Sequence, residues 1–105
     1  MKCFIPAAGY GKRMGDLTLN IPKPLLTISG IPLLELAIKA GISWKVEKFI
    51  INTHYKSEKI HQFVKKFDIL DIILSDEKEN ILGTGGGIRT GIEGIVRDNE
   101  YFLVF

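Results

Sequence analysis

Residues 6–15 carry the side chains and the spacing best suited to bind a phosphate group. Four small residues in this segment let backbone N–H groups approach a ligand closely, and concave backbone surfaces of this kind bind phosphate oxygens. Lys12 and Arg13 add positive charge, and an arginine can donate two hydrogen bonds to one phosphate. The small residues are Ala7, Ala8, Gly9 and Gly11. The segment predicts a phosphate-binding loop, and the alternative is an ordinary loop with two solvated bases.

Two familiar nucleotide motifs do not fit this segment. A dinucleotide-binding fingerprint needs a glycine three residues after Gly11, where Met14 stands. It also needs an acidic residue at the end of the next strand, which instead reads Asn-Thr-His at 52–54. A P-loop needs a glycine five residues before a Gly-Lys pair, and that position is Pro6. Neither motif is present.

Lys23 is flanked by Pro22 and Pro24. Proline fixes its own φ angle and drives the preceding residue toward an extended backbone, so we expect Lys23 to be extended and its ammonium held in one direction. Such a lysine could neutralise a phosphate in a transition state. A solvated lysine in a rigid turn is the alternative.

The segment 79–87 contains Glu79 and a run of three glycines after Thr84. Glycines at the start of a helix let a planar group lie against free backbone donors and acceptors, which could read the edge of a base. The alternative is a flexible helix start capped by Thr84. Because each glycine weakens a helix by about 1 kcal/mol relative to alanine, the run needs a reason.

The composition bounds the class of protein. The chain has 105 residues, 46% of them hydrophobic and 25% charged, which predicts one small folded domain rather than a disordered segment. A net charge of +2 gives no electrostatic footprint for nucleic acid or for an anionic membrane. We expect no membrane span and no signal peptide. The single cysteine, Cys3, favours core packing and a reducing, cytoplasmic setting.

Short apolar runs alternate with amphipathic stretches, as in a parallel α/β sheet. The expected strands are 2–6, 48–53, 70–75 and 101–105. Between the first strand and the first helix lies a loop over 7–24, far longer than the usual two to six or so residues, and loops of this length are usually functional.

Three helices are expected between these strands. The first has Pro32 in its first turn and ends near Gly41, while Ser57 and Thr84 can cap the second and third. Trp44 is expected to pack. Acidic residues around the third strand are expected to form a solvated rim, and the two histidines are not expected to bind a metal. The acidic residues are Asp68, Asp71, Asp76 and Glu77, and the histidines are His54 and His61.

Taken in order, the motifs closely resemble the N-terminal half of the sugar-1-phosphate nucleotidyltransferases. The resemblance rests on the Gly-x-Gly-x-Arg-Met loop that ends at Met14, on Leu-Thr at 17–18, on Pro-Lys-Pro at 22–24 and on Leu-Gly-Thr-Gly-Gly at 82–86. It covers essentially the whole chain. The N-acetylmuramate-1-phosphate uridylyltransferase branch looks nearest, and the mannose-1-phosphate guanylyltransferase branch is a close second.

The resemblance implies a three-layer αβα, Rossmann-like nucleotidyltransferase fold with a mostly parallel sheet, of which residues 1–105 are the nucleotide-binding half. The strand order is expected to be third, second, first, fourth. It implies a transferase that joins UTP or GTP to a sugar-1-phosphate and releases pyrophosphate. The catalytic residues would be Arg13 and Lys23. The nucleotide would contact Ala7, Ala8, Gly9, Gly11, Lys12, Arg13, Lys23, Glu79, Gly83 and Thr84.

Two departures from the family pattern bear on activity. Asp16 stands where the family usually has proline, which loosens the loop and adds negative charge near the phosphates. The aspartate that holds Mg²⁺ in the family would lie beyond Phe105, so the 105-residue chain is expected to be inactive alone, with no metal ligand of its own. A non-catalytic nucleotide-binding remnant, or a module completed by another chain, is the alternative. The last strand is apolar, which predicts self-association.

Overall fold

A computed structural model describes residues 1–9, 12–77, 83–96 and 101–105, with backbone only at 12–14 and 83–85. Its main sheet has four parallel strands in the order β5-β4-β1-β6. These strands are β1 (Lys2–Ile5), β4 (Lys48–Thr53), β5 (Asp71–Asp76) and β6 (Phe102–Val104). The expected strand order is therefore confirmed.

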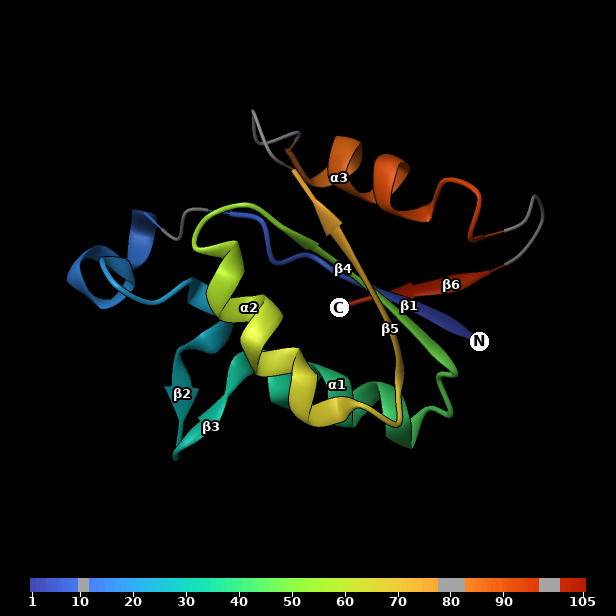
Figure 1. Cartoon of the computed structure of the whole chain (residues 1–105), viewed down its shortest axis with the longest axis horizontal. Coiled ribbons are helices and arrows are strands. Elements are labelled where there is room, and N and C mark those ends of the chain that lie inside the picture. The colour runs from blue at the N-terminus through green and yellow to red at the C-terminus, as the bar shows by residue number, and fades with distance from the viewer. Residues whose placement is uncertain (10–11, 78–82, 97–100) are drawn as a thin grey trace.

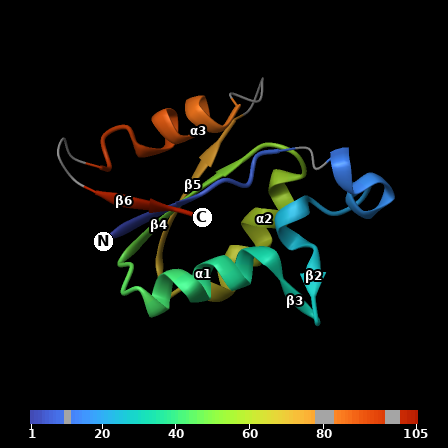
Figure 2. The same cartoon turned by 180° about the vertical axis from the view of Figure 1, so that it is seen from behind.

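Helices cover both faces of this sheet. The helix α3 (Gly83–Ile92) lies on one face, and α1 (Leu33–Ser43) and α2 (Ser57–Val64) lie on the other (Figures 1 and 2). The 3-10 turn η3 (Lys65–Phe67) continues α2 toward β5. This arrangement confirms the predicted three-layer αβα fold.

The two central strands form the core because helices cover both of their faces. Cys3 and Phe49 belong to the apolar cluster on the face of α1 and α2, together with Leu34 and Ile60. Burial raises the pKa of the Cys3 thiol to about 11, as expected for a packing residue rather than a reactive one. On the opposite face, α3 packs against Phe4 and Ile50.

The long segment after β1 contains structure that the sequence patterns did not predict. Two 3-10 helices, η1 (Lys12–Thr18) and η2 (Lys23–Leu25), are followed by a small antiparallel hairpin. Its strands are β2 (Thr27–Ile28) and β3 (Ile31–Pro32). The two residues that join them, Ser29 and Gly30, both have positive φ angles, as a tight hairpin turn requires.

Several expected details of the helices are wrong. Helix α1 runs past Gly41 to Ser43, and Gly41 instead makes room for the ring of Phe49. Helix α2 begins at Ser57, and the residue at its cap is Lys56, in a left-handed conformation. Thr84 lies inside α3 rather than at its cap. The expected packing residue Trp44 is 63% exposed.

Candidate nucleotide site

The candidate site lies where the strands of the parallel sheet end. All carboxyl ends of such a sheet meet at one edge, and open α/β folds bind their ligands beyond that edge. Here the edge brings together Ala7, His54 and Glu77, which follow β1, β4 and β5, and the first turn of α3 (Figure 1). Ala7 of the phosphate-loop segment and Gly87 of the glycine run therefore both lie beside Asn52 of β4 at this edge.

The first residues of the phosphate loop are held by burial and by a hydrogen bond to β4. Ala7 and Ala8 are buried, whereas Gly9 is exposed. The Ala7 N–H, which we expected to face a ligand, donates a hydrogen bond of 2.6 Å to Oδ1 of Asn52. Ala7 thus anchors the loop, and its amide is already engaged in this structure.

Other predicted loop residues are placed only in part. Lys12 and Arg13 begin the backbone of η1, and their side chains lie outside the described residues. Gly11 lies outside them altogether. Asp16 is exposed, consistent with a charge near the loop rather than in the core.

The far end of the loop is tied to the segment after β4. Tyr55 Oη donates to the carbonyl oxygens of Thr18 and Leu19, at 2.6 and 3.1 Å. Thr18 is buried, and its hydroxyl donates to the carbonyl of Gly15. Tyr55 was not predicted as a site residue, because its only sequence signal is its place just beyond a buried strand. Both ends of the loop are therefore attached near the carboxyl edge.

Lys23 is exposed and lies in a 3-10 turn closed by hydrogen bonds to the carbonyls of Pro22 and Lys23. The expected extended backbone at Lys23 is therefore wrong, because this turn outweighs the restriction that Pro24 imposes. Lys23 lines a hollow of about 340 Å³ with Pro6 and Phe105, at the ends of β1 and β6. Its predicted contact with the reacting phosphates stays a prediction.

Of the predicted base-binding residues, Glu79 lies outside the described residues. Gly83 and Thr84 form the start of α3, and their side-chain surroundings are likewise not described. Further along the helix, a β-carbon on Gly87 would lie 2.6 Å from Nδ2 of Asn52 and 2.9 Å from Oε2 of Glu77. The last glycine of the run therefore has a packing reason that is separate from ligand binding.

Glu77 does not belong to a solvated rim, which corrects the expectation. Only 6% of it is exposed, and its Oε2 accepts a hydrogen bond of 2.7 Å from Nδ2 of Asn52. Its backbone N–H donates to the carbonyl of Thr53, and its carbonyl contacts the ring of His54. The tertiary partner is 25 residues away in the chain, so local charge patterning could not reveal it.

A polar hollow of about 220 Å³ lies beside these residues. Its lining includes Asp76. Oδ1 of Asp76 accepts a hydrogen bond from the Thr53 hydroxyl and lies 2.8 Å from Nε2 of His61. His61 thus has a carboxylate partner that its sequence position did not suggest. Among the described side chains, no three His, Cys, Asp or Glu residues are grouped so that they could hold a metal ion.

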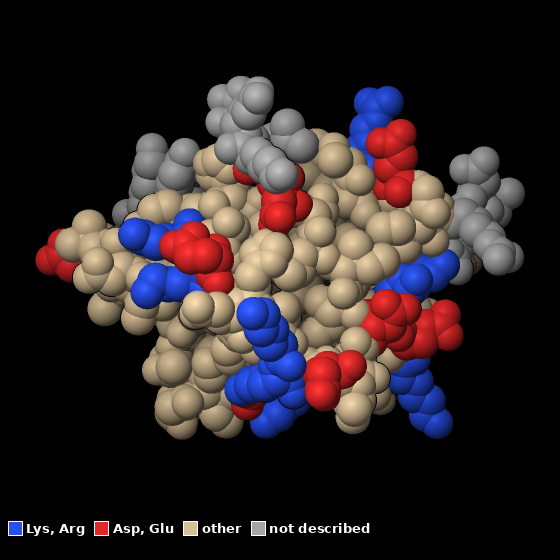
Figure 3. Space-filling view, in the orientation of Figure 1, with Lys and Arg blue, Asp and Glu red and all other residues tan. Residues whose placement is uncertain are grey.

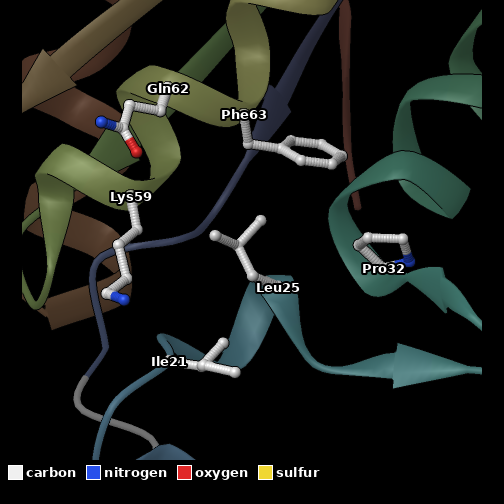
Figure 4. A pocket seen from close by; sticks show the side chains of 6 residues that line it. All are labelled: Ile21, Leu25, Pro32, Lys59, Gln62 and Phe63. Carbon is white, nitrogen blue, oxygen red and sulfur yellow. The ribbon is translucent and has the colours of Figure 1, made fainter.

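A third hollow, of about 410 Å³, lies between α2 and the segment around η2 (Figure 4). Of its six described lining residues, Lys59 alone is ionisable. The others are Ile21, Leu25, Pro32, Gln62 and Phe63. This lining offers little chemistry for a phosphate ligand.

On the face seen in Figure 3, basic and acidic side chains are interspersed among uncharged ones. Within the described parts of the chain, no helix is both long enough and apolar enough to cross a bilayer.

An αβα sheet with a glycine-containing loop after its first strand and a glycine-rich helix at the same edge is the architecture of nucleotide-binding α/β proteins. The chain belongs to the family of the MobA-like NTP transferase domain, whose model matches residues 3–105.

Three relatives illustrate this membership. The mannose-1-phosphate guanyltransferase of Saccharomyces cerevisiae is 32% identical over 107 aligned residues, which cover 99% of this chain and 29% of that protein. A UDP-glucose pyrophosphorylase complexed with UDP-glucose superposes with a TM-score of 0.81 at 28% identity, covering 98% of this chain and 43% of that one. HddC from Yersinia pseudotuberculosis, complexed with GMP-PN, gives a TM-score of 0.70 at 32% identity, covering 90% and 42%.

The resemblance stated from the motifs is thereby confirmed at the level of the family. The chain spans about 29% of the length of the mannose-1-phosphate guanyltransferases of Saccharomyces cerevisiae and Xenopus laevis.

Proposed function

We propose that this chain is the nucleotide-binding part of a sugar-1-phosphate nucleotidyltransferase that uses UTP or GTP. The observation that carries the proposal is that Ala7, at the start of the loop after β1, and Gly87 of α3 both lie beside Asn52 at the carboxyl edge of the sheet. Lys23 lines a hollow at the ends of β1 and β6. The names of the relatives support it, since they specify guanyl transfer to mannose-1-phosphate and a bound UDP-sugar.

In the proposed reaction, an oxygen of the sugar-1-phosphate attacks the α-phosphorus of the nucleotide. A new P–O bond forms as the bond to pyrophosphate breaks, which gives the NDP-sugar. Because the attacking phosphate is already an anion, the protein needs mainly to position the groups and to neutralise charge. Arg13 would bind the departing pyrophosphate and Lys23 would contact the reacting phosphates.

The nucleotide is proposed to contact both the loop after β1 and the start of α3. Gly9, Gly11 and Lys12 would hold the triphosphate with Arg13, and the base would lie near Glu79, Gly83 and Thr84. The backbone of Ala8 would approach the nucleotide closely. Ala7 would instead hold the loop in place through its hydrogen bond to Asn52.

Mg²⁺ is part of the proposal for a longer enzyme only. The described residues do not fit a metal site, because they form no group of ligands. An aspartate ligand beyond Phe105 is what the family resemblance implies. We therefore expect the 105-residue chain by itself to release no measurable pyrophosphate from UTP or GTP with any sugar-1-phosphate. A chain extended through the sugar-binding half should do so.

Self-association and a reducing, cytoplasmic setting belong to the same proposal. The first is supported by the exposed residues of β6 and its surroundings, where Tyr101 is 93% exposed. The second is supported by the buried, free thiol of Cys3.

Titration calorimetry tests the proposed binding. The chain should bind UTP or GTP more tightly than UMP or GMP, because the loop is assigned to the β- and γ-phosphates. Equal affinities for the triphosphate and the monophosphate would contradict the proposal.

A further inference from the structure

Asn52 joins two segments that the proposed function places on either side of the nucleotide. It lies near the carboxyl end of β4 and is 4% exposed. Its Oδ1 accepts from the Ala7 N–H at 2.6 Å, and its Nδ2 donates to Oε2 of Glu77 at 2.7 Å. A backbone N–H can only donate and a carboxylate can only accept, so the chemistry of the two neighbours fixes the orientation of the amide.

Helix α3 lies directly over this bridge. The Gly87 position leaves no room for a β-carbon, which would come within 2.6 Å of Asn52 Nδ2 and 2.9 Å of Glu77 Oε2. We call Ala7, Asn52, Glu77 and Gly87 the Asn52 joint. It connects β1, β4, β5 and α3 at the carboxyl edge of the sheet.

The two arms of the joint lead to the two halves of the candidate site. Ala7 opens the loop that carries Gly9 and Arg13, and Glu77 is the last described residue before the segment that leads to α3. A displacement of Ala7 would shift the loop relative to the helix, and misplacement by about 1 Å can lower the rate of reaction between bound groups by about a hundredfold.

We infer that Asn52 is a positioning residue. It holds the phosphate loop and α3 in the relative position that nucleotide binding requires. This inference rests on the function proposed above. An asparagine is required because one planar amide must accept on one side and donate on the other. Aspartate has the same shape but cannot donate to Glu77.

The test exchanges the donor and acceptor of the bridge. In Asn52→Asp, two carboxylates face each other, and we expect the affinity for UTP at pH 8 to fall by about 10- to 100-fold. The affinity for UMP should fall less, because UMP makes fewer contacts with the loop. In Glu77→Gln the Asn52 amide still has an oxygen acceptor, so the loss of UTP affinity should be smaller than in Asn52→Asp.

The double variant Asn52→Asp/Glu77→Gln restores one donor and one acceptor with their direction reversed. We expect it to recover UTP affinity to within about threefold of the wild type, as a coupled pair requires. Val64→Ala, in the core of α2, is the matched control, because it lowers stability without touching the joint. It should leave the ratio of UTP to UMP affinity unchanged.

A second readout needs no nucleotide. The Ala7 amide should exchange slowly with solvent in the wild type and faster in Asn52→Asp and in Asn52→Ser. The serine variant adds no charge and serves for binding as well if the aspartate variant does not fold.

An unchanged ratio of UTP to UMP affinity in folded Asn52 variants would overturn this inference and leave the proposed function standing. Failure of the double variant to recover would also overturn it. If the wild-type chain itself does not prefer UTP or GTP over the monophosphate, both the proposed function and this inference are wrong.

Discussion

A β-carbon on Gly87 would lie 2.6 Å from the side-chain nitrogen of Asn52, closer than unbonded carbon and nitrogen atoms can approach. Helix α3 therefore packs on the sheet through a position that only glycine can occupy without movement. The contact lies over a buried asparagine and a buried glutamate, so a shift of the helix would disturb both hydrogen-bonded partners.

Gly87→Ala should lower the free energy of unfolding by about 1–3 kcal/mol, as overpacking in a close contact does. The result is diagnostic because alanine favours a helix by about 1 kcal/mol over glycine, so propensity alone would stabilise the protein. Urea unfolding followed by circular dichroism measures the change. Gly9→Ala is the control, since a β-carbon there meets nothing within 4 Å. A stabilised Gly87→Ala variant would contradict the packing.

Arg13→Ala should weaken UTP binding by roughly 1.5–3 kcal/mol, or about 10- to 150-fold in Kd, the range for a hydrogen bond to a charged group. Calorimetric titration gives the value. Binding of UMP should change less, because the residue is assigned to the pyrophosphate end of the nucleotide. Arg89→Ala, an exposed arginine on α3, should have no effect on either ligand. Equal losses in the two variants would argue against a specific role for Arg13.

The thiol of Cys3 makes stability depend on pH in the alkaline range. Burial raises its pKa from 9.0 to about 11, so the folded state keeps the proton that the unfolded state releases. The contribution is complete below pH 9 and is lost as the pH rises toward 11, by on the order of 2–3 kcal/mol. Urea unfolding at pH 8 and pH 11 should therefore show a larger decline for the wild type than for Cys3→Ala. Parallel declines would contradict the assignment.

The open edge of β6 should promote self-association. This strand pairs with β1 alone among the described strands, and Val104 and Phe105 are 47% and 42% exposed. Light scattering at tens of micromolar, on the order of ordinary working concentrations, should show dimers or larger species for the wild type. Val104→Lys should yield a monomer, whereas Ile69→Lys, at an exposed residue preceding β5, should not. A monomeric wild type would refute the prediction.

The fold could be predicted from the sequence because its strands are short apolar runs. The strand 48–53 was predicted with its observed bounds, and the strand order follows the rules for parallel α/β sheets. The hairpin at β2 and β3 was missed, since strands of two residues carry no periodicity. The Ser29-Gly30 pair was its available signal.

The motifs predicted that the loop, Lys23 and the glycine run bind the nucleotide, and this assignment stays a prediction. They did not predict the hydrogen bonds that connect these segments to the rest of the fold. Glu77 is buried with a hydrogen bond to Asn52, and Tyr55 holds the far end of the loop through a hydrogen bond to Thr18. Both are tertiary contacts that no local sequence pattern encodes. The predicted cap of α2 was wrong for a similar reason. The backbone at Lys56 is left-handed, which makes Lys56 the cap and places Ser57 inside the helix.

The most direct test of the account is a titration of the isotope-labelled chain with UTP, followed by amide NMR shifts. We predict that the shifts cluster at the carboxyl edge of the sheet, at Ala8, Gly9, Lys23 and His54 and at the start of α3. Residues of the apolar hollow in Figure 4, such as Gln62, should not move. Shifts centred on that hollow, or no shifts at millimolar UTP (on the order of the weakest relevant affinity), would contradict the account.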